Sequence, residues 1–438
     1  MKLQGTMTIN EQGHLCIGGC DTVELVKKFG TPLYVMDEEY LRQICRDYYQ
    51  SFIVAYPNNK VLYASKAFLT KAMAKIIQQE KLGLDVVSGG ELFTAMQADF
   101  PAEQIYFHGN NKSVAEIEYA LDCKIGRFVV DNFYELELLH NLCQKRRTKA
   151  KILLRLSPGI EASTHEYIRT GQIDSKFGMP IATGQALEIV KKALSLEYID
   201  LKGIHCHIGS QIFEIASFGH TAEVMMDFLQ KIKAETGQEL AELNLGGGFG
   251  IYYQAGDTPA LINKFAEIIM TTIEQKARNL KINLPQVIIE PGRSIVGTAG
   301  TTLYTIGSIK QIPNIRTYVA VDGGMSDNPR PALYQAQYEA AVANKMQIEA
   351  TETVSITGKC CESGDMLIWD LQLPPLTSGD ILAVSCTGAY NYSMSSNYNR
   401  LPRPAVVLVK QGQADLIVAR ETYQDLVRND LIPTRLND

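Results

Sequence analysis

The chain has 438 residues, about three times the length of a typical domain, and 46% of them are hydrophobic while 21% are charged. This composition is that of a folded protein and excludes a disordered or low-complexity chain. The 42 basic and 48 acidic residues leave a formal charge of -6, which is too small and of the wrong sign for a surface that binds nucleic acid or anionic lipid. We therefore expect no nucleic-acid partner and no membrane association.

The start of the chain and its cysteines both favour a cytoplasmic protein. The first residues contain no apolar stretch of the kind found in secretory signals, and no run approaches the ~20 apolar residues that span a bilayer. The nine cysteines are an odd number, widely scattered and without a CxxC pair. We expect reduced thiols and no zinc bound by cysteines.

The N-terminal segment contains three short strand-like runs, TMTINE, HLCIGG and PLYVMD. They precede the first long helix-like stretch. Because strands without long helices return only after about residue 300, we expect residues 1–35 to join the C-terminal strands.

From residue 61 to residue 292 one pattern repeats: a short apolar run that ends in polar or glycine residues, followed by a helix-like stretch. Apolar strands that alternate with helices indicate parallel strands buried on both faces. Eight such units in about 250 residues favour an α/β fold of the (β/α)8 TIM barrel type over an open doubly wound sheet, which usually has fewer strands. The barrel is predicted at residues 36–299, with strands at 61–65, 84–88, 105–109, 127–131, 151–156, 204–209, 243–248 and 287–292.

After about residue 300 the pattern changes to strands without long helices, such as TYVAVDG, ILAVSCTG and AVVLVKQGQADLIVAR. This change predicts a second, all-β domain of sandwich or barrel type. We expect it to comprise residues 300–438 together with residues 1–35.

In a TIM barrel the chemistry collects at the carboxyl ends of the strands. The predicted strands end near Lys66, His108, residues 205–210, residues 246–248 and residues 290–293. These segments are rich in residue types used in catalysis, so we expect one active site at the mouth of the barrel.

Two of these strand ends predict a phosphate site. GGGFG at 246–250 is neither a dinucleotide fingerprint nor a P-loop. In barrels, however, glycine loops after the seventh and eighth strands commonly bind phosphate through backbone N–H groups, because glycine permits close approach. Arg293, in the PGR segment after the eighth strand, adds a charged donor.

A phosphate site beside a strand-end lysine indicates pyridoxal 5'-phosphate (PLP). A desolvated lysine amine can form a Schiff base with a carbonyl cofactor, and Lys66 is placed to do so. PLP also needs a partner for its ring nitrogen, and Glu290 would keep that nitrogen protonated. The residues therefore indicate carbanion chemistry at the α carbon of an amino acid.

The HCH triplet at 205–207 offers an alternative, a binuclear metal site. Such sites need further histidines and an aspartate on other strands, and their HxH lies on the first strand rather than the sixth. We expect no metal. For His207, stacking on a ring competes with the role of an ordinary core histidine.

Two segments of the predicted β domain stand out, KCCESGD at 359–365 and GAYNYSMSSNYN at 388–399. Taken alone, each resembles an ordinary loop, and a free cysteine is most often a small buried apolar residue. If a second subunit presents the first loop at the barrel mouth, Cys361 could donate a proton and Glu362 could bind a substrate ammonium. Sequence spacing leaves that geometry open.

In chain order, the motifs resemble those of the fold-type III PLP decarboxylases: YASKAF, HGNNKS, HCHIGSQI, LGGGFG and EPGRSIV. Within that family, a second set is similar to the diaminopimelate decarboxylases: THEYIRTGQIDSKFG at 164–178, VDGGMSDNPRPALY at 321–334, KCCESGD and GAYNYSMSSNYN. The two sets cover nearly the whole chain.

The resemblance implies a PLP-binding barrel, a β domain and a homodimer with shared active sites. It implies catalytic roles for Lys66, His207, Glu290 and Cys361. Cofactor binding would involve Lys66, His207, Ser210, Gly246, Gly247, Gly248, Glu290, Gly292, Arg293 and Tyr390. Cys361 and Glu362 would enter from the partner chain.

The implied reaction converts meso-2,6-diaminopimelate to L-lysine and CO2 by loss of the carboxylate at the D-centre, the last step of lysine biosynthesis. The nearest alternative is an ornithine or lysine decarboxylase. Those substrates carry only an ammonium at the distal end, whereas diaminopimelate also carries a carboxylate and so requires a cation. Substrate binding is predicted for Arg293, Arg330, Tyr334, Glu362 and Tyr390. Selectivity for the D-centre rests on the resemblance alone.

Two further classes are less consistent with the residues. A PLP racemase usually has a weaker acceptor at the ring nitrogen, and Glu290 argues against it. A relative that survives as a binding module should have lost a cofactor residue, and Lys66, His207 and Arg293 are all present.

Overall fold

The computed structural model describes residues 1–160 and 175–437. Its contacts divide the chain into two compact units. The barrel unit comprises Arg42–Ile251 and Thr258–Ile295, and the β unit comprises Met1–Leu41, Tyr252–Asp257 and Val296–Asp438. The boundaries placed at 36 and 299 from the sequence stay a prediction.

The barrel unit contains a closed ring of eight parallel strands within the described residues, which confirms the predicted (β/α)8 barrel. The ring closes where Ile288 of the last strand pairs with Lys60 of the first. The strands are β5 (Lys60–Ala64), β6 (Gly83–Val86), β7 (Ile105–Phe107), β8 (Arg127–Val130), β9 (Ala150–Ser157), β11 (Ile199–His205), β12 (Glu242–Asn244) and β13 (Gln286–Ile289), and the short β10 (Met179–Pro180) adds to β9.

The sixth strand differs most from its predicted position. It begins at Ile199 and ends at His205, five residues before the predicted start and four before the predicted end. Its first residues include the half-buried Asp200 and Lys202, so they show no apolar run in the sequence. As a result His207 and Ser210 lie in the loop after the strand.

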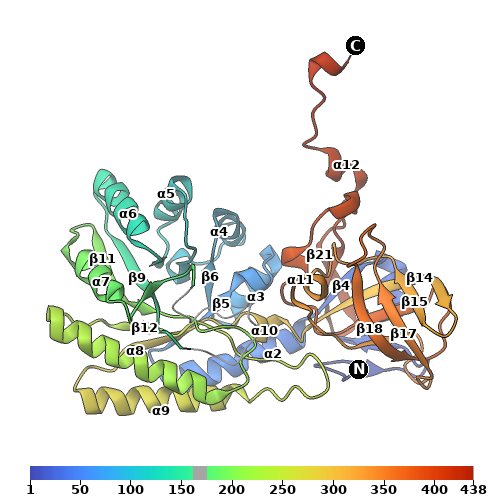
Figure 1. Cartoon of the computed structure of the whole chain (residues 1–438), viewed down its shortest axis with the longest axis horizontal. Coiled ribbons are helices and arrows are strands. Elements are labelled where there is room, and N and C mark those ends of the chain that lie inside the picture. The colour runs from blue at the N-terminus through green and yellow to red at the C-terminus, as the bar shows by residue number, and fades with distance from the viewer. Residues whose placement is uncertain (161–174, 438) are drawn as a thin grey trace. The chain divides into compact units, whose positions relative to one another are not determined.

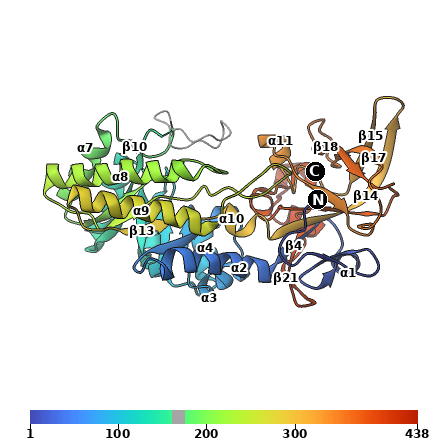
Figure 2. The same cartoon turned by 90° about the horizontal axis from the view of Figure 1, so that it is seen from below.

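Helices alternate with these strands, and α8 and α9 lie side by side in both Figure 1 and Figure 2. Four of the helices, α3 to α6, are preceded by an N-cap residue whose side chain accepts a hydrogen bond from a backbone N–H of the first turn. These residues are Thr70, Ser88, Ser113 and Asn132. The helices are α2 (Glu38–Tyr48), α3 (Lys71–Gln79), α4 (Gly89–Met96), α5 (Val114–Cys123), α6 (Phe133–Arg146), α7 (Gln185–Ser195), α8 (Ile215–Thr236), α9 (Ile262–Leu280) and α10 (Arg293–Val296).

The β unit is built on a mixed nine-stranded sheet, again within the described residues. Its strands are β4 (Leu33–Asp37), β14 (Gly300–Ile312), β15 (Arg316–Val321), β16 (Ala340–Val342), β17 (Glu352–Thr357), β18 (Met366–Leu373), β19 (Ile381–Val384), β20 (Ala405–Lys410) and β21 (Gln413–Val418). The N-terminal strand β4 lies between β14 and β20, which confirms that the PLYVMD segment joins the C-terminal strands.

The first two N-terminal runs are organised differently. β1 (Thr8–Ile9), β2 (Leu15–Ile17) and β3 (Cys20–Asp21) form a small sheet of their own. Short helices also occur in the β unit: α1 (Thr22–Phe29), α11 (Arg330–Tyr334) and α12 (Tyr423–Val427). Among the described helices of the chain, none has the length and apolar character needed to cross a bilayer.

Candidate active site at the barrel mouth

Lys66 lies immediately after strand β5. The strand ends at Ala64 and runs into a short 3₁₀ turn, Ser65–Ala67, whose central residue is Lys66. Ser65 and Ala67 are buried, whereas Lys66 is exposed. The barrel unit therefore presents the amine at the mouth, as predicted, but does not itself supply the desolvated surroundings that the sequence led us to expect.

His207 lies in the loop after β11 and is held as a neutral ring. Its Nδ1 accepts the N–H of Gly247 at 3.3 Å. Burial lowers the pKa of His207 well below its usual range, and the nearby charges of Lys66 and Arg155 lower it further. With Nδ1 as the acceptor, the proton of the neutral imidazole lies on Nε2. An uncharged flat ring is suited to stacking on a planar cofactor.

Arg293 and Ser210 form the cationic part of the predicted phosphate site. Arg293 is the first residue of α10 and is buried. Its Nε and Nη2 donate to Ser210 Oγ at 3.3 and 3.0 Å. A guanidinium and a hydroxyl held together in this way are donors of the kind that bind phosphate oxygens.

The glycine segments allow close backbone packing next to this pair. A Cβ on Gly247 would lie 2.2 Å from the carbonyl oxygen of Glu290, and one on Gly248 would lie 2.4 Å from that of Gly209. Gly248 also has a φ of +112°, which side chains rarely tolerate. A Cβ on Gly292 would lie 2.9 Å from that of Ala64. The loops after the seventh and eighth strands can therefore be this compact only with glycine.

Glu290 accepts hydrogen bonds from three strand ends. Its Oε1 lies 2.8 Å from His108 Nε2 and accepts from Asn244 Nδ2 at 2.6 Å, while its Oε2 lies 3.2 Å from His205 Nε2. Burial by itself would raise the pKa of Glu290, but the two histidines lower it well below its usual range. An ionised carboxylate fixed in this way suits a protonated ring nitrogen.

Three residues near Glu290 were not predicted from the sequence as part of the site: Asn244, Asp85 on β6 and Arg155 on β9. Asp85 Oδ1 lies 3.9 Å from His108 Nε2, and burial raises the pKa of Asp85. Burial also lowers the pKa of Arg155. The available signal was an ionisable residue inside an otherwise apolar strand, LDVVS or KILLRL, since such residues are rarely buried without a role.

The same cluster has the composition of a small metal site. One ligand atom from each of His108, His205 and Glu290 lies within 4.8 Å of the others. In the described chain both Nε2 atoms are already hydrogen-bonded to the carboxylate. The expectation of no metal stays a prediction.

Arg330, the predicted substrate cation, lies in the β unit as the first residue of α11. It is only 8% exposed. Its Nη1 donates to the hydroxyls of Tyr253 at 3.1 Å and of Tyr338 at 2.5 Å. Tyr334, which is predicted to bind the same carboxylate, is the last residue of α11, and this role stays a prediction.

Cys361 and Glu362 are exposed in the loop between β17 and β18. The backbone N–H of Cys361 donates to Asn399 Oδ1 at 2.7 Å. The buried Asp365 fixes the same loop, because its carboxylate accepts from the N–H of Cys360 at 2.8 Å.

The remaining motif positions are Tyr390 and the segment at 164–178. Tyr390 is half-buried with a φ of +62°. Most of the THEYIRTGQIDSKFG segment, including His165, lies outside the described residues.

The residues at the barrel mouth fit PLP: an accessible lysine, a neutral histidine ring, an ionised carboxylate, and an arginine and serine beside glycine loops. Residues 41–297 match the family model described as "Pyridoxal-dependent decarboxylase, pyridoxal binding domain". Fold and site thus define a pyridoxal-dependent decarboxylase whose cofactor is PLP.

Comparison with individual proteins narrows the family. The diaminopimelate decarboxylases of Halalkalibacterium halodurans and Bacillus subtilis are each 54% identical to this chain over 431 residues, which are 98% of this chain and 98% of theirs. The crystal structure of diaminopimelate decarboxylase from M. jannaschii in complex with L-lysine matches with a TM-score of 0.92 and 37% identity, covering 98% of this chain and 99% of that one. The chain belongs to the diaminopimelate decarboxylases.

Proposed function

We propose that this protein releases CO2 from the D-centre of meso-2,6-diaminopimelate and forms L-lysine, the last step of lysine biosynthesis in the cytoplasm. The family membership and the relative solved with L-lysine support the reaction. The observation that carries the substrate assignment is Arg330, a buried guanidinium whose hydrogen bonds go to two tyrosine hydroxyls. Such a cation suits the second carboxylate that distinguishes diaminopimelate from ornithine or lysine.

PLP, when bound, supplies an electron sink for the electron pair left on the α carbon as CO2 departs. Lys66 would hold the cofactor through its aldehyde and return to it after each turnover. Arg293, Ser210, and Gly246, Gly247, Gly248 and Gly292 would hold the phosphate, and His207 would lie against the ring.

Glu290 would hold a proton on the ring nitrogen throughout the reaction. Its carboxylate is ionised because His108 and His205 lower its pKa, and Asn244 fixes its orientation. With that nitrogen protonated, the ring would accept electrons more strongly, and loss of CO2 would be easier.

The substrate would be bound at its non-reacting end by opposite charges. Arg330, assisted by Tyr334 and Arg293, would bind the carboxylate, and Glu362 would bind the ammonium. Tyr390 would contact both cofactor and substrate. We further propose that the thiol of Cys361 donates the proton that replaces CO2 on the α carbon, and regains a proton from solvent.

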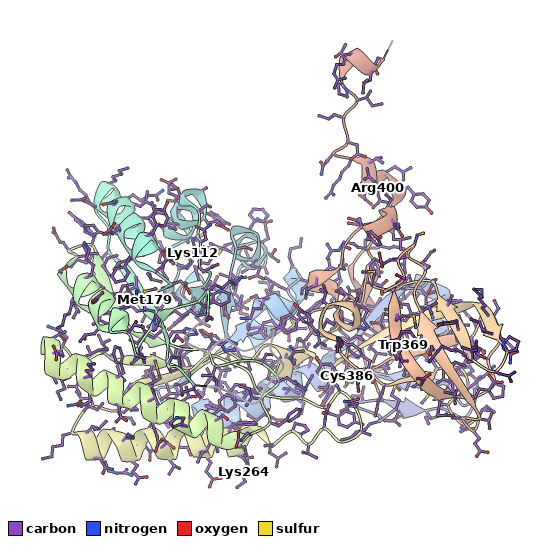
Figure 3. All side chains as sticks on the ribbon, in the orientation of Figure 1. Lys112, Met179, Lys264, Trp369, Cys386 and Arg400 are labelled. Atoms are coloured by element: carbon purple, nitrogen blue, oxygen red, sulfur yellow. The ribbon has the colours of Figure 1, made fainter. Side chains whose placement is uncertain are left out.

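Cys361 and Glu362 would come from a second copy of the chain in a homodimer with shared active sites. Both residues are exposed in the single chain, as residues that serve a partner must be. Leu333, 53% exposed, and Trp369, 55% exposed and labelled in Figure 3, are large apolar residues on the surface of the same unit. A groove of about 670 Å³ is lined in part by Trp369 and by Ser363 and Gly364 of the loop.

The test is CO2 release and lysine formation by purified, PLP-loaded protein, offered meso-diaminopimelate and, separately, L-ornithine and L-lysine. We expect turnover of diaminopimelate alone. Turnover of ornithine or lysine instead would retain the cofactor and refute the substrate, and absence of turnover with all three would favour a binding module.

A further inference from the structure

Arg330 is a buried cation without an acidic partner among the described residues. Lys112, which is also buried, pairs with Glu135, and the half-buried Arg127 pairs with Glu242. An uncompensated buried charge is costly, so the surroundings of Arg330 must offset that cost in another way.

Two tyrosine rings provide that compensation. The guanidinium carbon of Arg330 lies 5.0 Å from the ring centroid of Tyr253 and 5.6 Å from that of Tyr338. The two rings are nearly perpendicular, at 88°, with centroids 5.5 Å apart. The faces of aromatic rings attract a cation without neutralising it. Burial would lower the pKa of Arg330, but the two tyrosines outweigh burial and raise it, so the group remains charged.

Other residues of the β unit hold both tyrosines in place. Tyr253 belongs to the segment Tyr252–Asp257. This segment lies between β12 and α9 in the sequence but is part of the β unit. Glu339 anchors that segment by accepting the hydroxyl of Tyr252 at 2.8 Å and the N–H of Ala255 at 3.0 Å. The ring of Tyr253 therefore reaches Arg330 from a clamped segment.

Asn391, next to Tyr390, supports the second ring. It is fully buried, and its Nδ2 donates to Thr387 O at 2.9 Å and lies 3.5 Å from the hydroxyl of Tyr338. Its Oδ1 has no hydrogen-bond partner among the described residues. Beside Arg330 and the two tyrosines there is thus a second buried polar group, Asn391, whose Oδ1 can still accept a hydrogen bond. A binding site for a polar ligand would have such a group.

We propose that Tyr253 and Tyr338 are positioning residues that determine substrate specificity: they hold the Arg330 guanidinium buried, charged and open to the carboxylate at the non-reacting end of the substrate. Acidic residues in their place would pair with the guanidinium and compete with that carboxylate. The inference rests on the proposed function, because that function assigns the carboxylate to Arg330.

The test compares two ligands that differ by this carboxylate. L-lysine carries it and 1,5-diaminopentane does not. In Tyr253→Phe and in Tyr338→Phe the ring remains and the acceptor of the charged hydrogen bond is lost, so we expect the KM for meso-diaminopimelate to rise roughly tenfold while kcat changes by less than about threefold. Calorimetry on the PLP-loaded variants should show that the affinity for L-lysine falls by a similar factor and that the affinity for 1,5-diaminopentane is unchanged.

Tyr423→Phe is the control, because Tyr423 is a 74% exposed tyrosine of the same unit whose hydroxyl makes no hydrogen bond to Arg330 in the described chain. It should leave the preference for L-lysine unchanged. Equal weakening of both ligands, or unchanged KM and L-lysine affinity in both single variants, would overturn the inference. Either variant decides the question if the other does not fold.

The two proposals fail in distinguishable ways. Suppose that the wild type prefers L-lysine over 1,5-diaminopentane, that the tyrosine variants lose this preference, and that the wild type does not turn over diaminopimelate. That result would refute the proposed function and support the inference. Loss of that preference in Arg330→Leu but not in the tyrosine variants would support the function and refute the inference.

Discussion

At the scale of single residues, the ionisation of the barrel site depends on neighbours from several strands. His205 and Glu290 are an example: the histidine donates from Nε2 at 3.2 Å, and its own Nδ1 is buried without a partner among the described residues. Burial lowers the pKa of His205 to about 4. Burial keeps the histidine neutral although the ionised glutamate raises its pKa, and the hydrogen bond from the histidine in turn helps to keep the glutamate ionised.

This arrangement predicts a loss of stability in acid. The unfolded chain protonates His205 near pH 6.5 and the folded chain only near pH 4, so the unfolded state binds more protons across that window. The free energy of unfolding must then fall as the pH is lowered through it. In His205→Gln, which retains a donor but does not titrate, we expect the difference in unfolding free energy between pH 7 and pH 5 to shrink by up to about 2 kcal/mol. Urea unfolding at the two pH values measures this difference.

His220→Gln is the control, since His220 is a histidine with a 60% exposed side chain in the same unit. It should leave the pH dependence unchanged. An unaltered pH dependence in His205→Gln would show that His205 does not remain neutral in the folded chain.

At the scale of elements, the glycine loop after β12 depends on backbone packing. In Gly247→Ala the new Cβ would meet the carbonyl oxygen of Glu290 at 2.2 Å, and backbone cannot move aside as a flexible side chain can. We expect a stability loss of about 1–3 kcal/mol and weaker retention of PLP. Thermal unfolding and the cofactor absorbance after dialysis measure both effects.

Gly90→Ala is the matched control for that substitution. The nearest atom to its new Cβ would be Ser88 Oγ at 3.7 Å, so the methyl group has room. The control should match the wild type in PLP content and stability or exceed it slightly. Equal PLP retention in Gly247→Ala would contradict the proposed role of this loop.

The buried carboxylate of Asp365 helps to fix the loop that carries Cys361. The carboxylate of Asp365 accepts from the N–H groups of Cys360 at 2.8 Å and of Met325 at 2.6 Å, and so joins two loops. In Asp365→Asn, one of these donors would face an amide NH2 instead of an acceptor. We expect faster hydrogen exchange in peptides covering 358–365 and a kcat lowered about tenfold or more, because the proposed proton donor loses its support.

Asp380→Asn provides the comparison for Asp365→Asn. Asp380 is also buried and accepts a backbone N–H, from Thr377 at 2.8 Å, but lies in another loop. Its substitution should lower thermal stability without changing exchange in 358–365. Unchanged exchange in Asp365→Asn would contradict the anchoring role.

At the scale of the whole molecule, the proposed homodimer makes a quantitative prediction. Lys66→Ala removes the cofactor lysine and Cys361→Ala removes the proposed proton donor. If each active site takes Lys66 from one chain and Cys361 from the other, a mixed dimer has one intact site. Random exchange of subunits should then restore about a quarter of the wild-type activity to a mixture of two inactive proteins. Assays before and after exchange test this, and a mixture that stays inactive while exchange is demonstrated would place both residues in one chain.

The sequence by itself determined the class of fold and the positions of the barrel side chains. Each parallel strand is an apolar run buried on both faces, so seven of the eight were located closely from local pattern alone. Lys66, His207 and Arg293 follow strand ends, and the barrel brings such positions to one mouth. The joining of PLYVMD to the C-terminal strands was also predictable, because strands without long helices return only after about residue 300.

Only the tertiary structure decided which side chains act together. The first half of β11 is amphipathic, so no apolar run marked its start. Asn244 and His108 donate to Glu290 across strands that lie far apart in sequence, and Tyr253 reaches Arg330 because a segment leaves the order of the barrel and joins the β unit. Local periodicity reports whether a residue faces a core, but the partner of a polar side chain depends on pairing between distant strands, which no local pattern encodes.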